Sequence, residues 1–218
     1  MAVKTADKTA AGKRIEIPAP KTKTIAVKIR GTSPLVMHAF NPVDIGKIAE
    51  KQAAGSTASN RKTRDPKDFD ALCEAAKHYS TTGWIGIPAM AFKAAMVRAC
   101  SLLGLFMTTA RMVISVIPDG QDRAVPTDGL VRITKGEPKK FLTQAKNANG
   151  GPDIRSRPMW DAGWEATLRI EYDTEQLTDK DILSLVMRAG MLGVLEGRAN
   201  AKTGNDQGWG RFELAMKG

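Results

Sequence analysis

Residues 204–215 read Gly-Asn-Asp-Gln-Gly-Trp-Gly-Arg-Phe-Glu-Leu-Ala, a glycine-rich loop that leads directly into a short apolar strand. Gly204, Gly208 and Gly210 lack a Cβ atom, so the backbone there can adopt positive φ and approach another segment closely. Such a loop presents backbone N–H groups that suit phosphate oxygens, and Arg211 follows with a guanidinium that can bind one through two hydrogen bonds. On these residues alone two interpretations stay open: a phosphate-binding loop, or an ordinary glycine-containing turn before a strand.

Upstream of this loop, five further segments have the periodicity of regular elements. Ile25, Val27 and Ile29 alternate with more polar or smaller residues, which indicates a half-buried strand. Thr178 precedes an amphipathic helix and Asp181 stands three residues later, a variant of the capping box. The core elements are strand 24–30, helix 89–103, strand 112–117, strand 164–172, helix 178–195 and strand 209–215. This order predicts an α+β fold with a ferredoxin-like core, a split β-α-β arrangement that also frames RRM-like RNA-recognition modules.

The rest of the chain is expected to form one arm and two insertions around a single domain. Residues 1–23, rich in Lys, Thr and Ala, predict a flexible basic arm. The domain spans 24–218 and is interrupted at 41–82, where a helix is expected near 68–77, and at 120–158, which carries a strand and a basic hairpin-like stretch. Connections this long are usually functional or disordered.

Composition narrows the class of protein. The net charge is +10, from 33 Lys and Arg against 23 Asp and Glu. This excess favours a polyanionic partner, usually nucleic acid, although solubilising lysines without a partner give the same balance. Cys73 and Cys100 match neither a disulfide framework nor a metal site. The chain has no apolar run near the ~18 residues of a membrane span and no signal-peptide core. We therefore expect a soluble cytoplasmic protein with no membrane segment and no cofactor.

Three segments resemble motifs of the CRISPR-associated RAMP superfamily. Gly86-Ile-Pro-Ala-Met-Ala-Phe-Lys-Ala-Ala-Met-Val-Arg98 resembles its I-P-G-S-S-L-K-G-A-L-R signature, where a short strand passes into the first core helix. Thr32-Ser-Pro-Leu35 resembles an S-P-L motif after the first strand, and Gly208-Trp-Gly-Arg-Phe-Glu-Leu214 resembles the C-terminal G-x-G-R loop and strand. The three occur in the family's order, but both insertions are unmatched. Departures such as Ala89 and Ala94 favour a diverged relative, encoded by a phage or mobile element.

The resemblance implies the branch of backbone subunits that coat CRISPR RNA and polymerise along the single strand. In that branch the ferredoxin-like core forms a palm, and insertions project from it to grip the strand. Carried over to this chain, the resemblance places Lys93, the loop at 204–210 and Arg211 along the phosphate path. It requires the turn into helix 89–103 and the final loop to converge on one positively charged track. The expected partner is single-stranded RNA or DNA, with RNA favoured by the resemblance alone, and the expected assembly is a homo-oligomer or filament.

Single-strand binding without sequence preference needs a cationic groove and aromatic faces on which bases stack. Arg155 and Arg157 alternate along one extended segment, Phe141 is flanked by lysines, and Trp209 lies inside the glycine loop. The residues expected to bind nucleic acid are Lys93, Arg98, Lys135, Lys139, Lys140, Phe141, Arg155, Arg157, Gly204, Gly208, Trp209, Gly210 and Arg211. For each cation the alternative is a solvated side chain, and for each aromatic a place in the core.

Catalysis is not expected. Cys73 and His78 do not have zinc-ligand spacing, and no second pair of ligands accompanies them. Some RAMP relatives cleave RNA through a histidine base or a loop aspartate, and His38 and Asp44 occupy roughly those positions, so an endoribonuclease stays an alternative. A further alternative is a virus-encoded structural or assembly protein that binds no nucleic acid.

Overall fold

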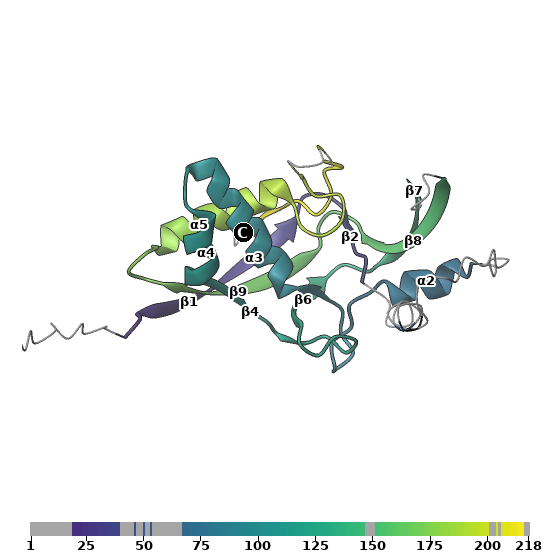
Figure 1. Cartoon of the computed structure of the whole chain (residues 1–218), viewed down its shortest axis with the longest axis horizontal. Helices are drawn as coiled ribbons and strands as arrows, with labels where there is room; N and C mark the ends of the chain where they lie inside the picture. Colours follow the sequence, from purple (N-terminus) through teal and green to yellow (C-terminus); the bar gives the residue numbers. More distant parts are fainter. Residues whose placement is uncertain are drawn as a thin grey trace, which may run out of the picture.

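The structure, a computed structural model, describes residues 19–39, 46, 50, 53, 67–146, 151–200, 204 and 206–215. Most of the expected arm, much of the insertion at 41–82 and Asp44 lie outside the described residues. The fold is α+β with antiparallel sheets, as predicted, and it is drawn in Figure 1. Within the described ranges, no helix combines the length and hydrophobicity needed to cross a bilayer.

The larger sheet is built around one long antiparallel pair. Its strands are β1 (Thr22–Gly31), β3 (Gly86–Pro88), β4 (Ile114–Ile117), β5 (Gly120–Gln121), β6 (Gly129–Lys135), β9 (Glu165–Asp173) and β10 (Phe212–Leu214). β1 pairs with β9 from Thr22, opposite Asp173, to Arg30, opposite Glu165. β10 lies on the free edge of β1, while β4 and β6 pair with the two halves of the other edge of β9. β3 and β5 pair with β6 and extend the sheet.

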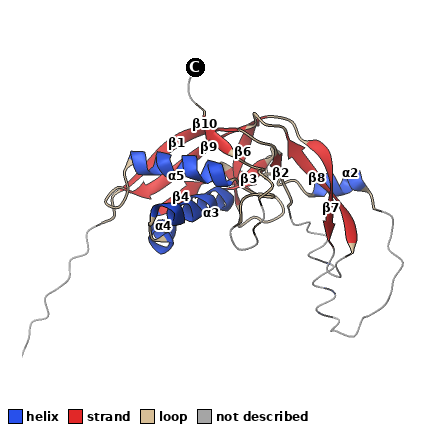
Figure 2. Ribbon diagram, turned by 90° about the horizontal axis from the view of Figure 1, so that it is seen from above, coloured by secondary structure: helices blue, strands red, loops and turns tan. Residues whose placement is uncertain are grey.

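Three helices lie on one face of this sheet (Figure 2). They are α3 (Ala89–Cys100), α4 (Met107–Val113) and α5 (Asp179–Leu192). Val27 and Ile29 are buried in the core under the helices, whereas the residues that follow each of them, Lys28 and Arg30, are exposed, so the predicted alternation along β1 is confirmed. The ring of Phe92 on α3 meets that of Phe212 on β10, with 5.8 Å between centroids. The helix α3 and the last strand, β10, therefore pack in one core.

α5 begins and ends for identifiable reasons. The N–H of Asp181 donates to Thr178 Oγ1 (3.3 Å) and the N–H of Thr178 donates to Asp181 Oδ2 (2.8 Å), so the predicted capping box is confirmed. At the other end Gly193 has a φ of 78°, which lies outside the helical region. The chain turns there toward the glycine loop.

Three of the predicted elements have other bounds in the structure. The helix expected at 89–103 ends at Cys100 and continues as the 3₁₀ turn η1 (Ser101–Leu103), after which Gly104 reverses the chain with a φ of 69°. The helix α4 follows, so the strand expected at 112–117 begins only at Ile114. The strand expected at 209–215 is also shorter, because the residues before β10 form a turn with positive φ at Gly208 and Gly210.

A smaller sheet and one helix extend away from the main sheet, on the right in Figure 1. Its strands are β2 (Leu35–Val36), β7 (Lys139–Lys146) and β8 (Pro152–Trp160), in the order β2-β8-β7. The helix α2 (Phe69–Ala75) packs on this sheet, where Ser156 Oγ donates to the carbonyl oxygen of Phe69 (2.6 Å). The second insertion thus contains a complete β-hairpin, of which the sequence indicated the basic first half.

Candidate nucleic-acid interface

A cationic cavity of about 290 Å³ lies between α3, α4 and the turn that follows α5. Four cations line it: Lys93, Arg98, Arg111 and Arg198. The remaining lining residues are Met90, Ala94, Val97 and Met107. No carboxylate belongs to this lining, as far as the described residues extend. The cavity therefore concentrates positive charge over an apolar floor, which is an arrangement that suits an anion.

α3 supplies one wall of the cavity by helical spacing. Met90, Lys93, Ala94 and Val97 are separated by three or four residues, so they lie on one face of the helix. The structure thus brings together Lys93 and Arg98, which the sequence predicted, with Arg111 and Arg198, which it missed.

Arg98 also holds the turn after α5 in place. Its Nη1 donates to the carbonyl oxygen of Ala199 (3.1 Å) and its Nη2 to that of Gly193 (3.2 Å). Its Nε is buried and has no hydrogen-bond partner among the described residues. Burial lowers the pKa of the Arg98 guanidinium, and the nearby charge of Arg198 lowers that pKa further. Arg98 is therefore a structural residue as well as a wall of the cavity.

The glycine loop packs against that same turn. A Cβ on Gly210 would lie 2.1 Å from the carbonyl oxygen of Val194, and one on Gly193 would lie 2.5 Å from that of Trp209. The N–H of Val194 donates to the carbonyl oxygen of Gly210 (3.0 Å). These glycines allow two segments of the same chain to approach, which accounts for their positions without a ligand.

The expectation of free N–H groups in the loop is wrong for three residues. The N–H of Gly208 donates to Asp206 Oδ1 (2.8 Å), that of Gly210 to the carbonyl oxygen of Pro34 (2.7 Å), and that of Arg211 to Ser33 Oγ (2.9 Å). The donors of Gly210 and Arg211 fasten the loop to the segment after β1, and that of Gly208 is used within the loop. A phosphate at this loop would have to be bound mainly by side chains.

Arg211 carries a carboxylate partner. Its Nη2 donates to Asp206 Oδ2 at 2.7 Å, and both side chains are 42% exposed. Because the pair is open to water, it contributes little stability, and a phosphate can compete for the guanidinium. Gly204, the other predicted residue at the start of the loop, has a φ of 67° and open space around it.

The β7–β8 hairpin also contacts the glycine loop. The rings of Phe141 and Trp209 make an edge-to-face contact with centroids 5.6 Å apart. Arg157 Nη1 lies 3.6 Å from Glu196 Oε2, and burial lowers the pKa of this arginine. The sequence named Phe141, Arg157 and Trp209 separately, and the structure brings them to one junction.

The other predicted cations lie apart from the cavity. Lys135 pairs with Glu165 (3.4 Å), Lys140 with Asp70 (2.7 Å) and Lys139 with Asp161. Arg155 lines a separate cavity of about 210 Å³ beside α2, together with His38 and Lys67. Arg98, in the last turn of α3, links this helix to the turn after α5, on which the glycine loop packs. Neither the described residues of the loop at 204–210 nor Arg211 lines the cavity that contains Lys93, so the track predicted to join them is not formed by this cavity.

The face of the larger sheet opposite the helices carries no aromatic side chain on the strands β1 and β9. Its exposed or half-exposed residues on these strands are Thr22, Thr24, Ala26, Lys28, Arg30, Glu165, Thr167, Arg169, Glu171 and Asp173. RNA-recognition modules stack bases on aromatic residues of such a face. The strands β1 and β9 therefore lack, on this face, the aromatic side chains that RRM-type binding uses.

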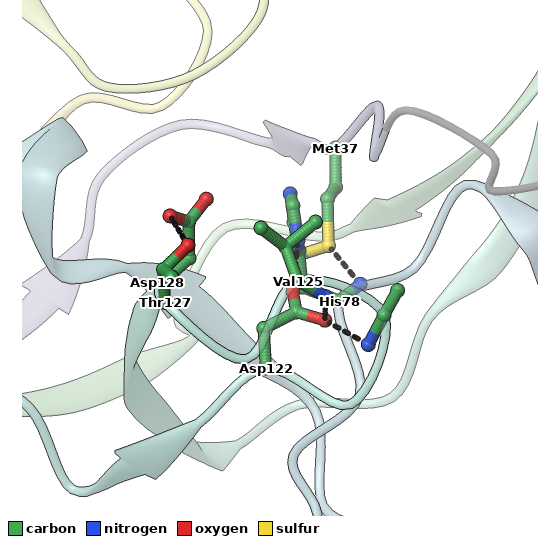
Figure 3. A network of polar contacts seen from close by, with 7 residues as sticks. Met37, His78, Asp122, Val125, Thr127 and Asp128 are labelled. Carbon is green, nitrogen blue, oxygen red and sulfur yellow. Dashed lines mark hydrogen bonds and ion pairs between the residues drawn. The ribbon is translucent and has the colours of Figure 1, made fainter. Parts of the chain in front are cut away.

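A histidine–carboxylate pair that the sequence did not predict joins the two insertions. His78 Nδ1 lies 2.6 Å from Oδ2 of the buried Asp122 (Figure 3). Asp122 Oδ1 accepts hydrogen bonds from the N–H groups of Ala124 (2.7 Å) and Val125 (3.3 Å). Neither His78 nor Asp122 lines the cationic cavity. We found no group of three or more metal-ligating side chains placed to hold a metal ion within the described ranges.

Comparison with known proteins concerns the fold. No protein-family model matches the chain, and no curated protein matches its sequence. A chain in the cryo-EM structure of the type III-B Cmr-beta bound to cognate target RNA matches with a TM-score of 0.51 and 12% identity, over 90% of this chain and 60% of that chain. The crystal structure of Cmr6 from Pyrococcus furiosus gives a TM-score of 0.41 and 13% identity, over 89% of this chain and 99% of that chain.

This protein shares the fold of the Cmr-beta chain. It spans about 60% of the length of that neighbour, and at 12% identity the likeness is one of fold alone.

Proposed function

We propose that this protein is a diverged RAMP-like subunit that binds single-stranded nucleic acid, RNA in preference to DNA, through contacts to phosphates. The three sequence motifs and the fold of the Cmr-beta chain support the same superfamily independently. The role proposed is non-catalytic: the protein coats the strand, and copies of it assemble side by side along it. Intact RNA after prolonged incubation with the purified protein is the expected result.

The proposed core is ferredoxin-like. α3 connects β1 to β4, and β9 lies between these two strands in the sheet. α5 connects β9 to β10, and β1 lies between those two. The two strands of the β1-α3-β4 unit are therefore separated in the sheet by a strand of the β9-α5-β10 unit, and the reverse also holds. A split β-α-β arrangement requires this relation.

The cavity lined by Lys93, Arg98, Arg111 and Arg198 is the observation that carries the binding proposal. These cations converge from α3, α4 and the turn after α5, and no carboxylate among the described lining residues offsets them. By contrast, Lys135, Lys139 and Lys140 each have a carboxylate partner. Phosphate contacts of this kind give affinity without reading sequence.

Fluorescence anisotropy with a labelled single-stranded RNA, the matching DNA and a duplex tests the proposal. The variant Lys93→Ala/Arg111→Ala should weaken binding to all single-stranded sequences alike. It should also flatten the slope of log K against log salt by about 0.7 for each lost phosphate contact. Lys180→Ala is the matched control, because Lys180 is an exposed lysine at the first turn of α5, the end remote from Arg198. An unchanged slope in the double variant, or loss for one sequence only, would contradict the proposal.

A further inference from the structure

We propose that the cationic cavity binds a terminal phosphomonoester, the phosphorylated end of a strand, more tightly than a phosphodiester within the strand. The protomer at the end of a strand would place the terminal phosphate in its cavity, and protomers further along would bind diesters there. This inference rests on the proposed function, because it names the part of the strand that the cavity takes. It is carried by the convergence of Lys93, Arg98, Arg111 and Arg198 on one cavity that is open to solvent.

The first argument is charge. A phosphodiester carries one negative charge, whereas a phosphomonoester carries about 1.5 to 2 negative charges near pH 7 and offers three strong acceptor oxygens. A groove that follows successive diesters needs its cations spread along the strand. Here four cations from three separate segments surround a single cavity. That arrangement matches one highly charged group better than a line of singly charged ones.

The second argument is the state of Arg98. Its two Nη atoms are fixed by Gly193 and Ala199, so the guanidinium is held in one orientation. Its Nε is buried, and no described residue accepts its hydrogen bond. The Nε atoms of Arg157 and Arg211 are also buried without a described partner, so this feature does not by itself mark an anion site. Burial and the charge of Arg198 both lower the pKa of Arg98, and an anion beside the two arginines would offset their repulsion.

The third argument is the size and floor of the cavity. Its volume of about 290 Å³ is close to the lower limit of roughly 300 Å³ for small-molecule sites, so it has room for about one nucleotide. Met90, Val97 and Met107 form an apolar surface beside the cations. Methionine side chains adapt to flat ligands, and the sugar and base of a terminal nucleotide can rest on them while the phosphate meets the cations.

Three RNA 12-mers of one sequence, each with an internal fluorophore, test the inference by anisotropy. They differ only in their ends: hydroxyl at both ends, a 5′-phosphate, or a 3′-phosphate. One of the two phosphorylated strands should bind about tenfold more tightly than the strand without a terminal phosphate. This preference should grow between pH 5 and pH 7, as the second phosphate proton with a pKa of about 6 is lost. Adenosine monophosphate, which carries a terminal phosphate, should compete for the cavity and abolish the preference for the phosphorylated RNA.

Lys93→Ala and Arg111→Ala are the informative variants, because they remove cavity cations without touching the hydrogen bonds that Arg98 makes to Gly193 and Ala199. The double variant should lose the preference for the phosphorylated end, and Lys180→Ala should keep it. Equal binding of all three RNAs to the unmodified protein would overturn the inference and leave the proposed function standing. A preference that survives in the double variant would also overturn it. If no RNA binds at all, the proposed function itself fails.

Discussion

Gly210 has a φ of 67°, and a Cβ atom at this position would lie 2.1 Å from the carbonyl oxygen of Val194. Gly204 has the same φ of 67°, but a Cβ there would meet nothing within 4 Å. A position can require glycine for two different reasons, and the sequence alone does not tell them apart. One is the backbone conformation, which both residues share, and the other is the close approach of a second segment, which only Gly210 has.

Substitution by alanine should distinguish these reasons. Gly204→Ala should lower the free energy of unfolding by about 1 kcal/mol, because alanine is disfavoured at positive φ. Gly210→Ala should lower it by about 3 kcal/mol or more, because the turn after α5 must also move. Urea unfolding followed by circular dichroism measures both values. Equal losses in the two variants would show that the approach to Val194 carries no cost.

Tyr172 makes the stability depend on pH at the alkaline end. Its hydroxyl donates to Asp179, a hydrogen bond that raises the pKa of Tyr172 to about 12 from an ordinary value of 10.0. Because the pKa of Tyr172 is raised in the folded state, the stabilisation that this hydrogen bond gives is fully present below pH 10 and is lost as the pH rises toward 12. The difference in unfolding free energy between the unmodified protein and Tyr172→Phe should therefore narrow above pH 10. A difference that stays constant to pH 11.5 would refute this assignment.

At the scale of elements, sequence reasoning succeeded where a segment carried its own signal. α5 was predicted from its apolar face and the Thr178–Asp181 capping box, and β9 from its alternation. α4 was missed because it has only seven residues, too short for a helical period to stand out, and it begins after a turn at Gly104. Two of the four cavity cations were missed for a related reason. Arg111 lies on α4 and Arg198 in the turn after α5, and only tertiary packing brings these two residues to Lys93.

The β7–β8 hairpin meets the glycine loop through Phe141 and Trp209, whose rings are 5.6 Å apart. Edge-to-face pairs are worth about 0.5–1.5 kcal/mol beyond the area they bury. A double-mutant cycle with Phe141→Ala and Trp209→Ala should therefore give a coupling energy in that range, measured by urea unfolding. Phe141→Ala paired with Trp84→Ala serves as the control cycle, because no ring contact joins those two among the described residues. Additive effects in the first cycle would mean that the hairpin and loop are not energetically linked.

For the whole molecule, the placement of the second insertion is the feature that local signals could not give. Periodicity predicted most of the elements, but the placement of β6 beside β9 and of the hairpin beside the final loop depends on contacts between residues far apart in the sequence. The helix-covered face carries the cationic cavity, and the opposite face of the sheet carries mixed charges without aromatics on β1 and β9. Any strand bound by this protein is therefore expected on the side of the helices.

Assembly along a strand is the prediction that belongs to this scale. If each protomer occupies a fixed length of strand and reads no sequence, the number of protomers per RNA should rise in proportion to strand length. Sedimentation velocity on single-stranded RNAs of increasing length, at saturating protein, measures that number. Lys93→Ala/Arg111→Ala should need more protein to reach the same number at a given salt concentration, because each lost phosphate contact weakens binding. Lys180→Ala should match the unmodified protein. A constant ratio of one protomer per RNA at every length would exclude a coating role while leaving single-strand binding intact.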